Sequence, residues 1–333
     1  MAKSGLNRNL QDAKHNKKDE FYTQLSDIER ELKYYKHHFK DKTVYCNCDD
    51  PRVSNFFHFF SYNFEKLGLK KLITTCYKNQ SVDLFSQNDS EQAIYLEYTG
   101  DKNGNKVPDP NEIGIKQLKG DGDFRSKESI SLLTQADIVV TNPPFSLFRE
   151  YISQLIEYNK KFVIIGSQNS ISYKEIFKLI KEDKIWLGYN AVKRFTMPED
   201  YEHNSIKIED GIKYAVFDNM GWFTNLDIAK RHEELILYKN YTPEEYPTYD
   251  NYNAICVNKV AEIPMDYNGV MGVPITFIEK YNPEQFEIIG SDYEVKEGLL
   301  PEIVNPNWKG KIDRAYLNGK RMYARLLIKN KRI

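Results

Sequence analysis

The sequence predicts an α/β protein whose core is a doubly wound, Rossmann-like sheet with helices on both faces. Two observations predict this fold. Short apolar runs typical of buried parallel strands alternate with segments of helical periodicity between residues 43 and 188. One of these runs, 138–141, passes directly into the turn Asn142-Pro143-Pro144-Phe145. Open α/β sheets bind ligands where strands end in this way, so this turn is the first candidate site.

The expected elements follow one another in chain order. Strands are predicted at 43–48, 71–76, 115–118, 138–141, 162–165 and 185–187, and helices at 56–64, 126–133 and 148–155. An earlier helix is expected to begin with a capping box formed by Ser26 and Glu29. Residues 79–110 are polar and are expected to be rich in loops. A strand-like run at 213–217 leads toward Trp222, which we expect in the core.

The turn Asn142-Pro143-Pro144-Phe145 has the chemistry to hold a flat ring that carries an exocyclic amino group. Its two prolines fix φ and bring no N–H groups, so this backbone presents carbonyl oxygens. The Asn142 amide oxygen and the Pro143 carbonyl would accept hydrogen bonds from the amino group, while Phe145 would stack on the ring. Two aligned acceptors favour the more nucleophilic, pyramidal nitrogen. The alternative is an ordinary rigid turn at the end of a strand.

Acids and aromatics at other predicted turns indicate a nucleoside site without phosphate. Phe21-Tyr22-Thr23 lies just before a helix N-terminus, which favours a carboxylate. Asp49-Asp50-Pro51 ends the first strand, where acids can bind ribose hydroxyls or an ammonium group. Asp123-Phe124 could hold an adenine by hydrogen bonding and stacking. The missing glycine-rich phosphate loop argues against NAD or ATP. The alternative for Phe21-Tyr22-Thr23 is a hydrophobic staple, and the alternative for Asp123-Phe124 is a helix cap.

Composition narrows the class of protein. A chain of 333 residues with 41% hydrophobic residues can bury the core of a globular enzyme, and it has no apolar run long enough to span a membrane. Residues 1–20 lack the apolar core of a signal peptide, so we expect a basic flexible arm and a cytoplasmic protein. Cys46 and Cys48 would share one face of a strand, but zinc needs more ligands and Cys76 and Cys256 offer no paired spacing, so we expect reduced thiols and assign no metal.

Charge is unevenly distributed along the chain. The net charge of −1 excludes a uniformly basic nucleic-acid binder, but residues 301–333 have a local balance of +7. Such a segment suits a surface that follows phosphates, and the alternative is a solvated tail. Phe195 is a candidate for the second face of a base pocket. The candidate phosphate contacts are Lys193, Arg194, Lys230, Arg231, Lys320 and Arg321.

These motifs together resemble the class I, adenosylmethionine-dependent amino-methyltransferases, in the family's order. More narrowly, the chain is similar to the EcoRI-type adenine-specific DNA methyltransferases over most of its length, less so at 79–111 and 190–220. It departs from the wider superfamily because it lacks the glycine of the first-strand motif and an acid after the second strand. The matching blocks are DEFYTQ, YCNCDDPRVSNFF, GDGDFRS, DIVVTNPPFSLF, YNGVMGVPITF and NPEQFE.

The resemblance implies a class I methyltransferase sheet and methyl transfer from S-adenosyl-L-methionine to N6 of a flipped-out adenine. The substrate would be a short palindromic site in double-stranded DNA. The resemblance alone suggests GAATTC as the sequence of this site. It assigns the catalytic role to residues 142–145 and cofactor binding to residues 21–23, 49–51 and 123–124.

The resemblance also divides the chain and sets its partners. We expect a basic arm at 1–20, a cofactor-binding and catalytic domain at 21–190, and a target-recognition region at 191–333 that includes the last strands of the fold. We expect a monomer that belongs to a restriction-modification system. It should not bind a membrane, should need no obligate protein partner and should make no direct contact with a cognate endonuclease. The alternatives are methylation of RNA bases or protein glutamine, and an inactive DNA-binding protein on the same fold.

Overall fold

The computed structural model describes residues 22–48, 54–75, 93–105, 108, 112–197, 206–209 and 211–333. Two compact units make up the chain. The first comprises Met1–Asn169 and Gly188–Leu226, and the second comprises Ser170–Leu187 and Asp227–Ile333. Residues 191–226, which are part of the segment 191–333 expected to include the last strands of the fold, therefore pack with the first unit.

In the described part of the chain, the first unit is built on a ten-stranded sheet. Its order is β1-β8-β10-β7-β6-β2-β3-β4-β5, and β9 pairs with β10. The strands are β1 (Tyr22–Thr23), β2 (Thr43–Asn47), β3 (Lys71–Thr75), β4 (Ile94–Tyr98), β5 (Gly114–Gln117), β6 (Ile138–Thr141), β7 (Lys161–Ser167), β8 (Trp186–Thr196), β9 (Ile206–Glu209) and β10 (Ile212–Thr224). Because β3, β2, β6 and β7 are parallel neighbours, the predicted doubly wound sheet is confirmed.

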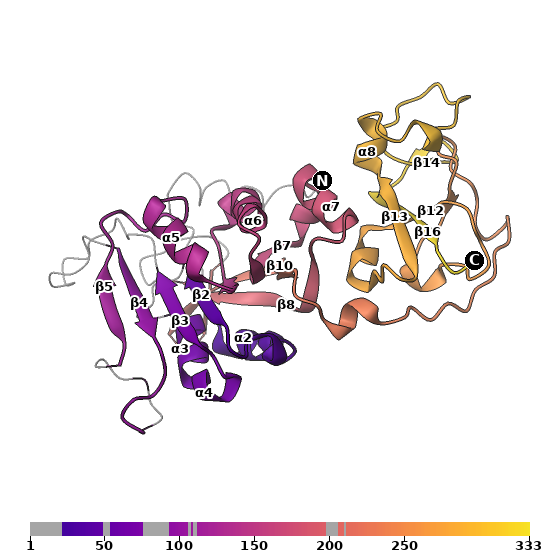
Figure 1. Cartoon of the computed structure of the whole chain (residues 1–333). Coiled ribbons are helices and arrows are strands. Elements are labelled where there is room, and N and C mark those ends of the chain that lie inside the picture. Colours follow the sequence, from indigo (N-terminus) through magenta and orange to yellow (C-terminus); the bar gives the residue numbers. More distant parts are fainter. Residues whose placement is uncertain are drawn as a thin grey trace. The chain divides into compact units, whose positions relative to one another are not determined.

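Helices cover both faces of this sheet, as predicted. Helices α5 and α6 lie on one face, and α2, α3 and α4 lie on the other (Figure 1). Helix α3 begins where the Ser54 hydroxyl accepts hydrogen bonds from the Phe56 and Phe57 amides, and α5 begins at a similar cap, Ser126. The bounds are α2 (Leu25–Leu32), α3 (Asn55–Tyr62), α4 (Phe64–Leu67), α5 (Lys127–Gln135) and α6 (Phe148–Glu157).

Two local predictions were wrong. Strand β4 lies inside the segment expected to be loops, and it pairs antiparallel with β3 and β5, which makes the sheet mixed. Its Leu96 and Tyr98 are buried because they point to the same face of the strand. The predicted capping box also fails. Pairing of β1 with β8 brings the chain to Gln24, from which α2 starts without a side-chain cap, so Ser26 lies inside the first turn.

The second unit has its own sheet, with the strand order β11-β12-β16-β13, and a separate hairpin of β14 and β15. Asp292, 2% exposed, accepts hydrogen bonds from the Tyr252 hydroxyl and the Arg325 amide, and burial raises the pKa of this carboxyl group. The bounds are α7 (Lys174–Lys181), β11 (Ile255–Cys256), β12 (Met271–Pro274), β13 (Phe286–Ser291), α8 (Asp292–Lys296), β14 (Tyr316–Leu317), β15 (Lys320–Arg321) and β16 (Arg325–Asn330).

Short 3-10 helices connect these elements in both units. They are η1 (Lys36–His38), η2 (Phe145–Leu147), η3 (Gln168–Ser172), η4 (Ala229–His232), η5 (Val260–Glu262), η6 (Ile275–Lys280) and η7 (Pro301–Ile303). The second of them continues the turn after β6 into α6, so the candidate turn is followed at once by regular structure.

A buried carboxylate fixes α2 against β8. Glu31 is fully buried and accepts hydrogen bonds from the Tyr189 amide, from the backbone and side-chain amides of Asn190, each at 2.8 Å, and from the Tyr35 hydroxyl at 2.9 Å. Burial raises the pKa of Tyr35 well above its usual value, so its hydroxyl stays a donor. A Cβ added to Gly188 would overlap the Glu31 carboxylate, so only glycine permits this close approach.

We expect Glu31→Ala to lower the free energy of unfolding by at least about 1–3 kcal/mol, because it leaves buried amide donors without an acceptor. Urea unfolding followed by circular dichroism measures this change. Glu29→Ala, an exposed position on the same helix, is the control and should stay within about 0.5 kcal/mol of the wild type. Equal unfolding midpoints for the two variants would contradict the role given to Glu31.

Candidate active site

The turn Asn142-Pro143-Pro144-Phe145 leaves the carboxyl end of β6, which lies between β2 and β7 in the middle of the sheet. Asn142 is 5% exposed and Pro143 is buried, whereas Phe145 is partly exposed at the start of η2. The sequence-predicted turn is therefore at the sheet edge where open α/β proteins bind ligands.

Hydrogen bonds tie this turn to the end of β2. The Thr141 hydroxyl donates to the Asn47 carbonyl, and the Tyr151 hydroxyl of α6 donates to the Asn47 side-chain oxygen. Burial raises the pKa of Tyr151 well above its usual value, so its hydroxyl remains a donor. Cys48, with φ 81°, then adopts the left-handed conformation that favours glycine. A residue other than glycine therefore adopts this conformation directly after β2.

Three phenylalanine rings meet beside the turn. Phe145 contacts Phe195 of β8 at a centroid distance of 5.7 Å and Phe217 of β10 at 6.0 Å, both edge-on. Phe195 and Phe217 contact each other at 5.6 Å. Because Phe195 is fully buried against Phe145, its role as the second face of a base pocket stays a prediction. Sequence reasoning missed Phe217, although the burial of Ala215 and Phe217 at alternate positions follows a strand pattern.

Asp123 and Phe124 lie together before α5, and Arg125 contacts both. The Asp123 carboxylate accepts hydrogen bonds from the Arg125 amide, Nε and Nη2, which lower the pKa of Asp123. The Arg125 guanidinium lies 5.2 Å from the centre of the Phe124 ring. A carboxylate has about four acceptor positions, so one remains for a ligand. Stacking on Phe124, which is 6% exposed, would require Arg125 to move.

The other predicted cofactor residues are only partly described. Tyr22 and Thr23 form β1, which pairs with the end of β8. The Thr23 hydroxyl is buried and has no hydrogen-bond partner in the described part of the chain, while its carbonyl accepts from the Asn55 side chain. Phe21, Asp49, Asp50 and Pro51 lie outside the described residues.

The candidate arginines for DNA contact have protein partners. Arg194 pairs with Glu209 at 2.7 Å, and Arg321 pairs with a nearby aspartate at 2.9 Å. Arg231, 14% exposed, pairs with another aspartate and lies 3.8 Å from the centre of the Trp186 ring. A phosphate would have to share or displace these partners, so DNA contact by these three residues stays a prediction.

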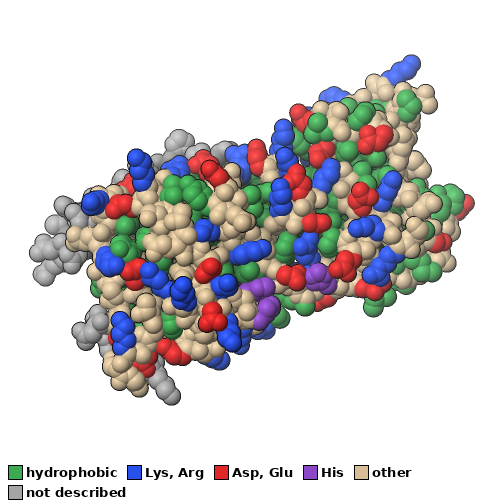
Figure 2. Space-filling model, viewed as in Figure 1, with side chains coloured by type: hydrophobic (Ala, Val, Ile, Leu, Met, Phe, Trp, Pro, Cys, Tyr) green, Lys and Arg blue, Asp and Glu red, His purple; other side chains and the backbone are tan. Residues whose placement is uncertain are grey.

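Two of the candidate lysines differ from the arginines in lacking an ion pair within the described part of the chain. Lys193 and Lys320 are exposed and form no ion pair with the residues that the structure describes, and Lys230 is partly exposed. On the face drawn in Figure 2, Lys and Arg side chains are interspersed with Asp and Glu. On this face, any surface that binds phosphate must therefore be a local feature. Within the described ranges, no cluster of three His, Cys, Asp or Glu side chains could hold a metal, and no helix could cross a membrane.

Comparison with known proteins decides the family. The model of the family described as adenine-specific methyltransferase EcoRI matches residues 9–331. The chain belongs to this family. The type II methyltransferase M.EcoRI of Escherichia coli is 52% identical over 341 residues, which cover 100% of this chain and 99% of that protein. The resemblance found in the motifs is thereby confirmed.

Two relatives from mycoplasmas extend the family. The type II methyltransferase M.MgeORF184P of Mycoplasma genitalium is 41% identical, with 96% of this chain and 98% of that protein covered. M.MpnI of Mycoplasma pneumoniae, also a type II methyltransferase, is 37% identical, with 96% and 97% covered. No solved structure matches this chain. Both compact units lie within these matches, so the methyltransferase family includes the second unit as well as the sheet.

In this adenine-specific methyltransferase, we expect Phe217→Leu to lower turnover by roughly 2- to 10-fold, because an aromatic pair contributes about 0.5–1.5 kcal/mol. Affinity for the cofactor should not change. Phe64→Leu removes a similar edge contact, to Tyr98 at 5.0 Å, and serves as the matched control. Steady-state methylation assays of both variants test the assignment, and an equal fall in turnover for the two would contradict it.

Proposed function

We propose that this methyltransferase transfers a methyl group from S-adenosyl-L-methionine to N6 of an adenine flipped out of a short site in double-stranded DNA. The observation that carries this proposal is the position of the Asn142-Pro143-Pro144-Phe145 turn. It leaves β6 at the carboxyl edge of a doubly wound sheet and is tied to the end of β2. Membership of the adenine-specific family supports adenine as the target.

The residues at this edge suit the cofactor. Thr23 brings a buried hydroxyl without a hydrogen-bond partner in the described part of the chain, which a polar group of a ligand would satisfy. Asp123 keeps one acceptor position for an amino group. Bound S-adenosyl-L-methionine would supply the electrophilic methyl group. We assign its binding to residues 21–23, 49–51 and 123–124.

Asn142, Pro143 and Phe145 would act on the target base. The amide oxygen of Asn142 and the carbonyl of Pro143 accept the two amino hydrogens, and they favour the pyramidal nitrogen whose lone pair attacks the methyl group. Phe145 stacks on the adenine ring and holds the nitrogen in line. Pro144 contributes rigidity because its ring fixes its own φ, and it lies in the chain between the two acceptors and the Phe145 ring.

The geometry of the turn supports base flipping. N6 of a paired adenine lies inside the stack, whereas Asn142 is 5% exposed on a turn fixed by two prolines. A rigid turn of this kind cannot enter the stack, so the base has to leave it. Extrusion costs a few kcal/mol, which stacking on Phe145 and two hydrogen bonds would offset.

We assign DNA recognition to residues 191–333, which comprise the last strands of the first unit and most of the second. The basic segment 301–333 would follow phosphates. The relatives are named type II methyltransferases, which supports a place in a restriction-modification system. We propose that the enzyme works as a monomer on the bacterial nucleoid, without an obligate protein partner and without direct contact with a cognate endonuclease.

Incubation with tritiated S-adenosyl-L-methionine and unmethylated bacterial genomic DNA, followed by digestion to nucleosides, tests this function. We expect the label in N6-methyldeoxyadenosine. Sequencing of the methylated DNA then locates the site. Label in RNA bases or protein glutamine instead of DNA would establish the alternative enzymes, and DNA binding without any label would establish an inactive DNA-binding protein.

We expect Asn142→Ala to slow single-turnover methylation by roughly 100- to 1,000-fold, because it removes a hydrogen bond that strengthens in the transition state. Cofactor affinity, measured by calorimetry, should be unchanged. Asn63→Ala, which removes a side chain bonded only to the end of α3, is the control and should retain its rate. A rate near wild type for Asn142→Ala would refute the role given to this amide.

A further inference from the structure

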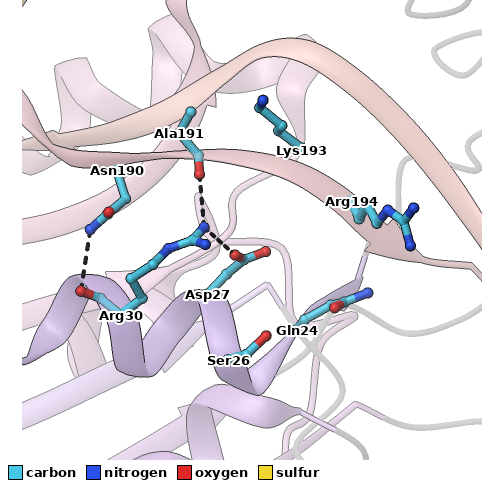
Figure 3. A pocket seen from close by; sticks show the side chains of 8 residues that line it. All are labelled: Gln24, Ser26, Asp27, Arg30, Asn190, Ala191, Lys193 and Arg194. Carbon is cyan, nitrogen blue, oxygen red and sulfur yellow. Dashed lines mark hydrogen bonds and ion pairs between the residues drawn. The ribbon is translucent and has the colours of Figure 1, made fainter.

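A pocket of about 520 Å³ opens between α2 and β8 in the first unit (Figure 3). Among the described residues, neither the catalytic turn nor the proposed cofactor residues 22–23 and 123–124 line it, so it is distinct from the described part of the proposed active site. Its walls are preformed because Glu31 fixes α2 against β8. The lining residues are Gln24, Ser26, Asp27, Arg30, Asn190, Ala191, Lys193 and Arg194.

Arg30 is held in this pocket with part of its guanidinium unused. Its Nη2 donates to Asp27 at 2.5 Å and to the Ala191 carbonyl at 3.2 Å, and the Asn190 side chain donates to the Arg30 carbonyl at 3.2 Å (Figure 3). Its Nε and Nη1 form no hydrogen bond with the residues that the structure describes. A guanidinium anchored in this way presents its remaining donors in a fixed fork, which fits the oxygens of a phosphate.

Among the described residues, the charges around the pocket leave one positive charge in excess. Asp27 compensates Arg30, and Glu209 compensates Arg194 at 2.7 Å. Lys193 is exposed and has no such partner among the described residues. A phosphodiester carries a single negative charge, so one phosphodiester matches this excess.

The pocket also lies close to the catalytic turn along β8. Lys193 precedes Phe195 by two residues, a distance of about 7 Å along an extended strand. The Phe195 ring contacts Phe145, on which the adenine would stack. Successive nucleotides of one DNA strand rise by about 3.4 Å. A phosphate in the pocket would therefore belong to a nucleotide within a few steps of the target.

We propose that the α2/β8 pocket binds one phosphodiester of the strand that carries the target adenine, a proposal that rests on the proposed function. Lys193 supplies the counter-charge, and the free donors of Arg30 bind the phosphate oxygens. Because α2 and β8 are fixed to each other, the bound phosphate is a fixed point on the backbone about which the target nucleotide rotates.

Duplexes that carry the mapped site, each with a single uncharged methylphosphonate linkage near the target adenine, test this proposal. Fluorescence anisotropy gives their affinities for the wild type, Lys193→Gln and Arg30→Gln. At one linkage, we expect loss of the phosphate charge to weaken DNA binding by the wild type about 10-fold. At the same linkage, the affinity of Lys193→Gln should change less than about twofold. Lys193→Gln should also lower the slope of log affinity against log salt by about 0.9.

Lys70→Gln is the matched control, because Lys70 is exposed at the amino end of β3 and should keep the full methylphosphonate effect. The proposal is overturned if the wild type and Lys193→Gln lose affinity equally at every linkage. N6 methylation of the unmodified duplex by the same wild-type preparation separates the two questions. If the duplex is methylated but the methylphosphonate effect does not depend on Lys193, only the phosphate-binding role of the pocket is rejected. If the duplex is not methylated, the proposed function is rejected.

Discussion

Two hydrogen bonds to Asn47 hold together the parts of the sheet on which the proposed chemistry depends. Thr141 is the last residue of β6 and donates to the Asn47 carbonyl, while Tyr151 of α6 donates to its side chain. Asn47 is 4% exposed, so each acceptor would cost about 1–3 kcal/mol if it were left without a donor. The strand that leads to the proposed cofactor acids is thereby locked to the strand that leads to the proposed catalytic turn.

The proposed catalytic turn is also supported from the opposite side, by β8 and β10. Phe195 and Phe217 contact Phe145 from these two strands. Both rings belong to 190–220, where the resemblance to the family weakens and to which we assign part of target recognition. The region to which we assign selection of the DNA site therefore reaches the ring that would receive the base. Recognition and base capture can be coupled through direct packing rather than through a distant signal.

The parts of the fold that the sequence predicted are those fixed by local pattern. Buried apolar runs located β2, β3, β6 and β7, and the double proline located the candidate turn. Contacts between distant residues were not predictable in the same way. The bond from Thr141 to Asn47 spans 94 residues, and β4 became a strand through its pairing with β3. The free donors of Arg30 likewise depend on β8, far along the chain, so no local motif marks the α2/β8 pocket.

Direct observation of the target base is the measurement that tests the central claim, a rigid acceptor turn that captures a flipped adenine. 2-Aminopurine placed at the methylated position reports unstacking through its fluorescence when enzyme and a cofactor analogue are added. We predict a large rise with the wild type. Because stacking on Phe145 quenches part of the signal, the Phe145→Ala variant is measured as the control for quenching. If neither protein changes the fluorescence while binding is saturated, the base stays stacked and the role given to Asn142 is contradicted.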